Sequence, residues 1–326
     1  MPLSILSKND IHTAVLSSAL AENTRIAYAK GWQRFQDYCT ENGIPPLSAT
    51  PEQIADFLIH VAMQPSPRSG NLLSMGTVAI YKSAINKQYL EAEHPSPTTS
   101  PIVHATFKGL TRLRSTPCRR VKALREYHVR EMLRVCDTVA QQPARRQIGL
   151  RDGALLALGF AGALRRSELC ALTIGDIEAV PGAPRRKAYL YIRKSKTDQA
   201  GRGHRIALLD GDTVRPITRL YTWLDASGIT QGPLFQTMRR GGTTRGKPLH
   251  PSDIPRLVKH YATCIGLDAR EVSGHSLRAG FVTSAAVHHA RLDKIMEITR
   301  HTNPSTVMKY IRDADMFSDH AGAGFL

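Results

Sequence analysis

The stretch AYLYIRKSKTDQAGRGHRIALL, residues 188–209, decides the fold class. Apolar and polar side chains alternate at both of its ends, which is the period of a half-buried strand. Its middle is polar and contains glycine, as a turn between two paired strands requires. We therefore expect two short antiparallel strands here. The sequence on either side has helical spacing, so the predicted fold is mainly α with a small antiparallel β-sheet.

Helical patterns surround this hairpin in the second half of the chain. The run RDGALLALGFAGAL (151–164) is apolar enough for a buried helix. Helical spacing begins near Glu126 and resumes at 212–227, 251–265, 276–289, 292–299 and 303–312. We expect one domain over 125–326, which ends in a C-terminal tail.

The first half is predicted to be an all-helical domain of four or five helices over residues 21–112. A first helix from Thr24 has four apolar positions on one face: Tyr28, Trp32, Phe35 and Cys39. Asn23 or Thr24 is expected to cap it. PEQIADFLIHVAMQ, from Pro51, and MGTVAIYKSAINKQYL, from Met75, repeat the pattern, and a short helix is expected near 102–112.

The segments outside these domains are a predicted flexible leader, 1–20, and a predicted linker, 113–124. The linker lies within RLRSTPCRRVKALR, which holds six basic and no acidic residues. Such a segment is either solvated or placed along a phosphate backbone.

The whole chain is basic, with 44 Lys+Arg against 27 Asp+Glu and a net charge of +17. This excess favours an anionic partner, most often nucleic acid, over a merely soluble basic protein. No run of about 18 apolar residues and no signal peptide is evident, so no membrane partner is expected. The five cysteines form no C-x-x-C pair, which argues against a zinc site or a disulfide framework. A cytoplasmic protein without a structural metal is expected.

No single residue identifies the chemistry of this chain, as its two H-x-x-R pairs illustrate. His275 and Arg278, and His288 and Arg291, both have the spacing of one helix face. The first pair stands at an expected helix start, where backbone N–H groups help to hold a phosphate. The second stands at the far end, where cations simply suit the helix dipole.

The combination of segments is more specific. Five occur in order: GALRRSELCAL (162–172), RKSKTD (193–198), SGHSLRAG (273–280), RHTN (300–303) and VMKYIRD (307–313). This series resembles the tyrosine recombinase (phage integrase) family, and its last three segments resemble the Cre branch. The resemblance implies a two-domain DNA clamp, in which an all-α, SAM-like core-binding domain precedes an α+β catalytic domain.

The resemblance also implies site residues. The matching catalytic positions are Arg165, Lys196, His275, Arg278, His301 and Tyr310. Glu168 matches an acidic residue that supports the site. Arg166 and Lys194 compete with Arg165 and Lys196, but the registers R-x-S-E-L and K-T select the latter. Each residue also has an ordinary alternative, such as a surface ion pair of Arg165 with Glu168 or a core tyrosine at Tyr310.

These residue types suit phosphoryl transfer. Guanidinium groups stabilise charge on the non-bridging oxygens of a phosphodiester. Tyr310 would be the nucleophile, with His275 as the candidate general base. Lys196 would protonate the departing 5′ oxygen, and His301 would donate a hydrogen bond to the phosphate. Two arginines and a lysine neutralise charge, so neither metal nor cofactor is expected.

The expected activity is site-specific DNA recombination through a 3′-phosphotyrosyl intermediate and a Holliday junction. The resemblance implies a homotetramer on two duplex sites, each of two inverted half-sites, in a bacterial or phage nucleoid. The tail, 317–326, is expected to dock on a neighbouring protomer. Candidate DNA contacts are Arg119, Arg120, Lys122, Arg239, Arg240 and Arg245. The alternatives are a type IB topoisomerase, a telomere resolvase, a silent DNA-binding relative and an RNA-binding helical protein.

Overall fold

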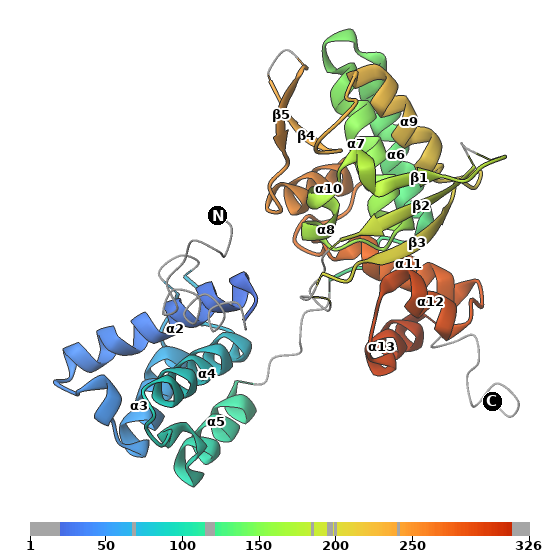
Figure 1. Ribbon diagram of the computed structural model, residues 1–326. Coiled ribbons are helices and arrows are strands. Elements are labelled where there is room, and N and C mark those ends of the chain that lie inside the picture. The colour runs from blue at the N-terminus through green and yellow to red at the C-terminus, as the bar shows by residue number, and fades with distance from the viewer. Residues whose placement is uncertain are drawn as a thin grey trace, which may run out of the picture. The chain divides into compact units, whose positions relative to one another are not determined.

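The computed structural model describes residues 20–66, 70–114, 121–183, 186–193, 198, 201–239 and 242–314, with side chains up to 311. The chain divides into two compact units, Met1–Cys118 and Arg119–Leu326 (Figure 1), and each is described by itself. Within the described residues both units are mainly helical, and β-strands occur only in the second. This confirms the predicted fold class. The leader up to 19 and the middle of the predicted linker lie outside the described residues.

The N-terminal unit is built of amphipathic helices: α2 (Glu22–Glu41), α3 (Pro51–Met63), α4 (Met75–Glu91) and α5 (Pro101–Leu113). The predicted inner face of α3 is buried at all four positions, Ile54, Phe57, Leu58 and Val61. Phe35 of α2 meets Phe57 edge to face, with ring centroids 5.0 Å apart. These aromatic and aliphatic side chains form the core of the unit.

Helix capping was predicted incorrectly at α2. The helix begins at Glu22 and Ala21 occupies the cap position without a side-chain bond, so Asn23 and Thr24 lie inside the helix. By contrast, Thr50 caps α3, because its hydroxyl accepts from Gln53 N–H while the Gln53 side chain accepts from Thr50 N–H. This reciprocal pair satisfies two backbone donors of the first turn.

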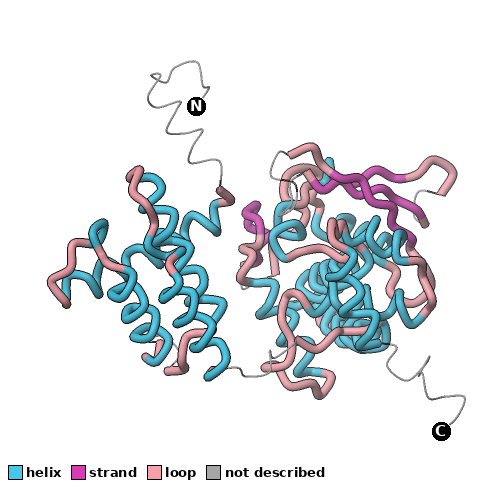
Figure 2. The backbone as a smooth tube through the Cα atoms, turned by 90° about the horizontal axis from the view of Figure 1, so that it is seen from below, coloured by secondary structure: helices cyan, strands magenta, loops and turns pink. Residues whose placement is uncertain are grey.

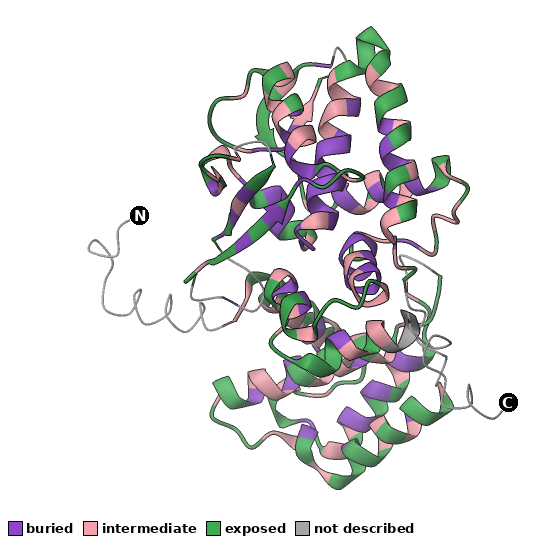
Figure 3. Cartoon of the chain, turned by 90° about the vertical axis from the view of Figure 1, so that its right-hand side faces the viewer, coloured by how far each residue is buried: buried purple, intermediate pink, exposed green. Residues whose placement is uncertain are grey.

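Helix α7 lies at the centre of the C-terminal unit and contacts α6, α9 and α11. It is buried at every position from Asp152 to Phe160, as predicted for this apolar run, and buried positions are purple in Figure 3. The helices of the unit are α6 (Glu126–Gln141), α7 (Arg146–Ala161), α8 (Arg166–Ala171), α9 (Pro216–Ser227), α10 (Asp253–Cys264), α11 (Ser276–Val287), α12 (Leu292–Thr299) and α13 (Pro304–Ala314).

The predicted hairpin is present as β2 (Lys187–Ile192) and β3 (His204–Leu209), which are antiparallel. Leu190 lies opposite Ile206, and both face the core, as the alternating pattern requires. A short strand that the sequence did not indicate, β1 (Ile177–Ala179), pairs with the other edge of β2. Figure 2 shows the strands, in magenta, at the edge of this unit outside its helices.

A second small sheet was also not predicted. It consists of β4 (Gln236–Met238) and β5 (Thr244–Pro248), an antiparallel pair. The Gln236 side chain is buried, and its Oε1 accepts from the Gly246 N–H at 2.8 Å. This bond ties β5 to β4 without any apolar alternation in β5.

The segment that enters α6 is fixed along α11, which carries two of the predicted site residues. Leu124 N–H donates to Ser276 O at 3.0 Å, and Lys122 N–H donates to Glu271 O at 2.7 Å. The approach is so close that a Cβ on Gly280 would lie 1.8 Å from Leu124 O. Residues 121–125 therefore belong structurally to the C-terminal unit.

A separate small core holds the last helices together. Val282 of α11, Ile295 of α12 and Val307 of α13 are buried against one another, and Tyr310 packs at their edge. In Figure 1 these three helices lie together at the lower end of the C-terminal unit. Among the described residues, no helix combines the length and the apolar character needed to span a bilayer.

Candidate active site

Arg165 is positioned by the turn between α7 and α8. Ala163 in that turn has φ +44°, and Arg165 then takes an extended conformation as the residue before α8. Its Nη1 donates to Glu168 Oε1 at 2.7 Å, and its N–H donates to Glu168 Oε2 at 2.8 Å. The Arg165 side chain is 13% exposed, whereas Arg166 is exposed. The structure thus brings Arg165, and not its neighbour, to the buried carboxylate.

Arg278 projects from the first turn of α11 and is only 3% exposed. Its Nη1 donates to Ala163 O at 2.7 Å, and its Nη2 donates to Thr299 O. One guanidinium therefore links the α7–α8 turn to the end of α12. Because two carbonyl oxygens accept its hydrogen bonds, the buried guanidinium is held in one position.

A third guanidinium, that of Arg300, lies in the same cluster and was not predicted from the sequence. Its Nη2 donates to Glu168 Oε2 at 2.7 Å, and its side chain is 2% exposed. The name guanidinium cluster is used below for Arg165, Arg278, Arg300 and Glu168. No local pattern indicates Arg300, because Glu168 is 132 residues away in the sequence.

The charges in the guanidinium cluster are unequal, three cations to one anion. Burial raises the pKa of Glu168, but the positive charge of Arg300 and the bonds from Arg165 outweigh this, so the pKa is lowered. Burial, and then Arg165 and Arg300, lower the pKa of Arg278 to about 9, while Glu168 and Tyr310 raise it. All three arginines remain cations at pH 7. The cluster therefore attracts an anion.

His301 follows the cluster directly, and Thr299 orients its ring. The Thr299 hydroxyl donates to Ile295 O at 2.7 Å and lies 2.8 Å from His301 Nδ1. A hydroxyl has one hydrogen, so its oxygen accepts from Nδ1–H and the neutral ring presents Nε2 as an acceptor. Burial is the largest cause that lowers the pKa of His301 to about 4, followed by the charges of Arg278, Arg165, Arg300 and His275.

His275 occupies the residue before α11, as the sequence indicated for a helix start, and its side chain is exposed. Its charge contributes to the lowered pKa of His301. The competing pair His288 and Arg291 does not share a helix face. His288 follows the last residue of α11, Arg291 precedes α12, and Arg291 pairs with Asp293 instead.

Tyr310 on α13 is half-buried beside the same cluster. Its ring packs on the small core of α11, α12 and α13. Its phenol is close enough to Arg278 to raise the pKa of that guanidinium. Tyr310 is therefore only partly buried, and its phenol is one of the groups that act electrostatically on Arg278.

Lys196 and its competitor Lys194 lie outside the described residues, as do Arg119, Arg120, Arg240 and the tail from 315. The base of the loop that carries Lys196 is described. Arg193 pairs with buried Asp176 on one side. On the other side Asp198 accepts from Gly203 N–H at 2.7 Å. These two contacts fix Arg193 and Asp198, the described residues on either side of Lys196.

The remaining predicted DNA contacts are distributed over the C-terminal unit. Lys122 lies 3.5 Å from Glu271 at the start of the segment along α11. Arg239 and Arg245 are exposed, in the turn and on the second strand of the β4–β5 hairpin. None of the three belongs to the guanidinium cluster.

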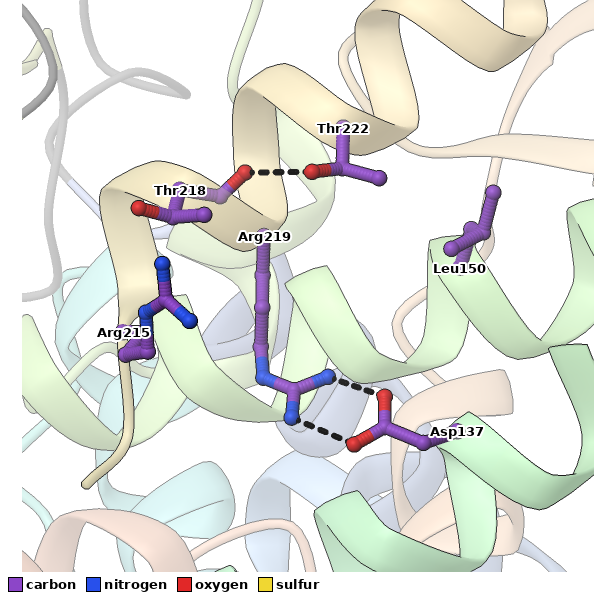
Figure 4. A pocket seen from close by; sticks show the side chains of 6 residues that line it. All are labelled: Asp137, Leu150, Arg215, Thr218, Arg219 and Thr222. Carbon is purple, nitrogen blue, oxygen red and sulfur yellow. Dashed lines mark hydrogen bonds and ion pairs between the residues drawn. The ribbon is translucent and has the colours of Figure 1, made fainter. Parts of the chain in front are cut away.

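The described residues offer no other obvious chemical centre. They contain no group of three or more His, Cys, Asp or Glu residues placed to hold a metal. A pocket of about 240 Å³ lies between α6, α7 and α9 (Figure 4). Arg219 in it is paired bidentately with Asp137, at 2.6 and 2.7 Å. The pocket shares no residue with the guanidinium cluster.

Known proteins resemble this chain in sequence and in fold. The sequence profile of the phage integrase family matches residues 122–316. The chain is 32% identical over 308 residues to an integrase/recombinase xerD homolog of Selenomonas ruminantium, covering 94% of this chain and 86% of that protein. It is 26% identical over 301 residues to tyrosine recombinase XerD of Yersinia pestis, covering 90% and 88%.

Two solved structures share the fold. One is the XerH site-specific recombinase bound to a palindromic difH substrate in a post-cleavage complex, with TM-score 0.66, 17% identity and coverage of 91% of this chain and 78% of that one. The other is a lambda integrase dimer bound to a COC′ core site, with TM-score 0.59, 19% identity and coverage of 93% and 94%.

The placement in the Cre branch remains a prediction. The family profile matches more than half of the chain, and the identity to the first relative extends over nearly all of it. These two findings establish the family, and the shared fold agrees with it. The chain belongs to the phage integrase family, the tyrosine recombinases.

Proposed function

We propose that this chain cleaves and rejoins duplex DNA at specific sites, with Tyr310 as the nucleophile. The observation that carries the proposal is the guanidinium cluster, in which Arg165 and Arg300 pair with the buried carboxylate of Glu168 and Arg278 is buried at the same turn. The phenol of Tyr310 acts electrostatically on Arg278. A phosphodiester entering there would supply the missing negative charge. Tyr310 would then attack phosphorus, form a 3′-phosphotyrosyl bond and release a 5′ hydroxyl.

Arg165 and Arg278 are the proposed phosphate ligands. Their planar forks can bind two non-bridging oxygens each, and the charge on these oxygens grows in the transition state. Both side chains are already held by protein acceptors, Arg165 by Glu168 and Arg278 by Ala163 O. Little reorganisation is therefore needed when the phosphate arrives.

The proton transfers are assigned to three side chains. A phenol has a pKa near 10, so Tyr310 must lose its proton as it attacks, and exposed His275 is the proposed base. The Lys196 ammonium is the proposed donor to the 5′ oxygen. His301 in its neutral form accepts at Nε2, and it becomes a donor to a phosphate oxygen only when it takes up a proton.

Rejoining follows by the same chemistry in reverse. The phosphotyrosyl bond replaces one ester by another, so the 5′ hydroxyl of a partner strand can attack it without ATP. Four protomers on two duplex sites, each of two inverted half-sites, would exchange strands in pairs through a Holliday junction. The two units would close on DNA as a clamp, with Lys122, Arg239 and Arg245 among the phosphate contacts. The protein would act in the bacterial or phage nucleoid.

The test is a trapped cleavage product. The substrate is a duplex with the DNA sequence that flanks the gene for this chain, and it carries a nick next to the cut site. Cleavage releases a short fragment from this duplex, so the covalent complex accumulates. Tyr310→Phe should bind this DNA but form no adduct, whereas Tyr127→Phe, a change on the exposed face of α6, should form it normally. Adduct formation by Tyr310→Phe would refute the assignment of the nucleophile.

The same assay separates the two H-x-x-R pairs. His288→Ala should leave cleavage nearly intact, whereas Arg278→Lys should reduce it severely, because an ammonium cannot replace the planar fork. The opposite result would show that Arg278 is not the arginine that binds the phosphate. An adduct with relaxation of supercoils but no recombinant product would favour the topoisomerase alternative.

A further inference from the structure

We propose that Arg300 is a positioning residue for DNA cleavage, which holds Glu168, and through it Arg165, in the orientation that receives the phosphate. The inference rests on the proposed function and adds a residue that the assigned catalytic set does not contain. Arg300 touches no substrate in this proposal; it acts through the carboxylate.

The backbone of Arg300 shows that an arginine here carries a cost. The residue ends α12 in the left-handed conformation, with φ 56° and ψ 40°. Glycine adopts this conformation freely, whereas the Cβ of another residue crowds the following carbonyl oxygen. The side chain is also nearly removed from water, at 2% exposure. Its Nε is buried without a hydrogen-bond partner among the described residues. Local strain of this kind is typical of positions with a functional task.

The contacts of Arg300 converge on the turn that presents Arg165. Nη1 donates to Ile298 O at 2.7 Å and to Gly162 O at 3.3 Å. Nη2 donates to Glu168 Oε2 at 2.7 Å. The guanidinium therefore spans from the end of α12 to the α7–α8 turn and the first turn of α8.

Glu168 is the shared partner that passes this constraint on. Its Oε1 accepts from Arg165 Nη1 and its Oε2 from Arg165 N–H, while Arg300 binds Oε2 from the other side. Without Arg300 the carboxylate would keep one cation and gain freedom to rotate toward it. Arg165 would then follow the carboxylate instead of remaining aimed at an incoming phosphate.

Charge gives the same arrangement a second role. Glu168 alone would neutralise Arg165 and leave one cation, Arg278, for the phosphate. Arg300 offsets the carboxylate, so the guanidinium cluster keeps two positive charges unbalanced. This excess matches the two negative charges of the phosphate in the transition state, one more than the bound phosphodiester carries.

The test uses single-turnover cleavage of the nicked duplex together with gel-shift affinity and thermal unfolding. Arg300→Gln should slow cleavage by roughly ten- to a hundredfold, the range produced when a catalytic group is displaced by about 1 Å. The DNA concentration for half-saturation should change by less than about threefold, because the phosphate contacts along the duplex remain. Arg300→Lys should retain part of the rate, since it keeps the charge without the fork.

Two control variants separate the role of the Arg300 side chain from effects on folding: Arg300→Gly and a matched change at Arg215. Arg300→Gly relieves the left-handed backbone, so its loss of cleavage cannot be attributed to strain at that residue. Arg215→Gly removes an arginine of the same conformation, φ 49°, that is exposed and lies in the pocket of Figure 4. It should cleave at the parent rate.

A double-mutant comparison decides whether Arg300 acts through the carboxylate. The losses of Arg300→Gln and Glu168→Gln should not multiply, and the double variant should cleave no more slowly than the worse single one. Multiplying losses, or Arg300 variants that cleave at the parent rate, would overturn the inference. Failure of the parent itself to form an adduct would instead refute the proposed function.

Discussion

Gly280 gives the sharpest test of the packing that positions α11. In Gly280→Ala the new Cβ would lie 1.8 Å from Leu124 O and 2.4 Å from its carbonyl carbon, both backbone atoms. A tolerable contact of 3.0 Å requires a separation of about 1.2 Å more than this. Neither partner can rotate away, because Leu124 is fully buried and its N–H is bonded to Ser276 O.

The expected cost follows from these contacts. Overpacking costs about 1–3 kcal/mol, and loss of the bond between Leu124 and Ser276 adds about 1 kcal/mol. The better helix propensity of alanine returns about 1 kcal/mol. A net loss of about 1–3 kcal/mol should lower the midpoint of thermal unfolding of the C-terminal unit by roughly 2–12 °C.

The two tryptophans allow this unit to be followed alone. Trp32 lies in α2, and Trp223 is fully buried in α9. In a Trp32→Phe background, fluorescence reports only on Trp223. Gly175→Ala is the control, because its Cβ would meet nothing closer than 3.7 Å and should leave the midpoint unchanged. A Gly280→Ala midpoint within about 1 °C of the parent would contradict the reasoning, since even 1 kcal/mol moves it by more.

Three further changes test separate parts of the molecule. Tyr261→Phe removes the hydroxyl that donates to buried Asp152 at 3.0 Å, so the free energy of unfolding should fall by about 1–3 kcal/mol in urea titrations; no change would contradict that role. Thr50→Ala should cost about 1 kcal/mol by losing the cap of α3, and equal stability would exclude the capping pair. His301 has a pKa lowered to about 4, so the unfolded chain binds more protons between pH 4 and 6.5 and stability falls as pH falls through this window. His301→Gln should flatten that decline, and an unchanged slope in pH-dependent unfolding would argue against a neutral His301.

The sequence predicted those elements whose side chains alternate or repeat on one face. The inner positions of α3 and the pairing of β2 with β3 follow from apolar periodicity alone. The strand β1 has only three residues, which is too short for alternation to be recognised. The hairpin of β4 and β5 has no apolar stripe, and its pairing depends on a buried glutamine side chain.

The predicted site residues came from an ordered set of motifs, and the structure brings Arg165, Glu168, Arg278 and His301 together with Tyr310. Local sequence could not reveal Arg300. Its partners Glu168 and Gly162 are 132 and 138 residues away, and its backbone conformation is one that sequence patterns associate with glycine. The tautomer of His301 was likewise hidden, because it depends on the hydroxyl of Thr299 bonded within α12.

The close crossing of residues 121–125 over α11 determines where the polypeptide can be cut. A fragment that starts at Glu126 would lose the strand-like cover over Gly280 and the N–H groups that satisfy Glu271 O and Ser276 O. It would also lack the buried side chain of Leu124 and so expose the core residues that pack against it. Isolation of the C-terminal half for biophysical work should therefore retain Val121 and everything after it.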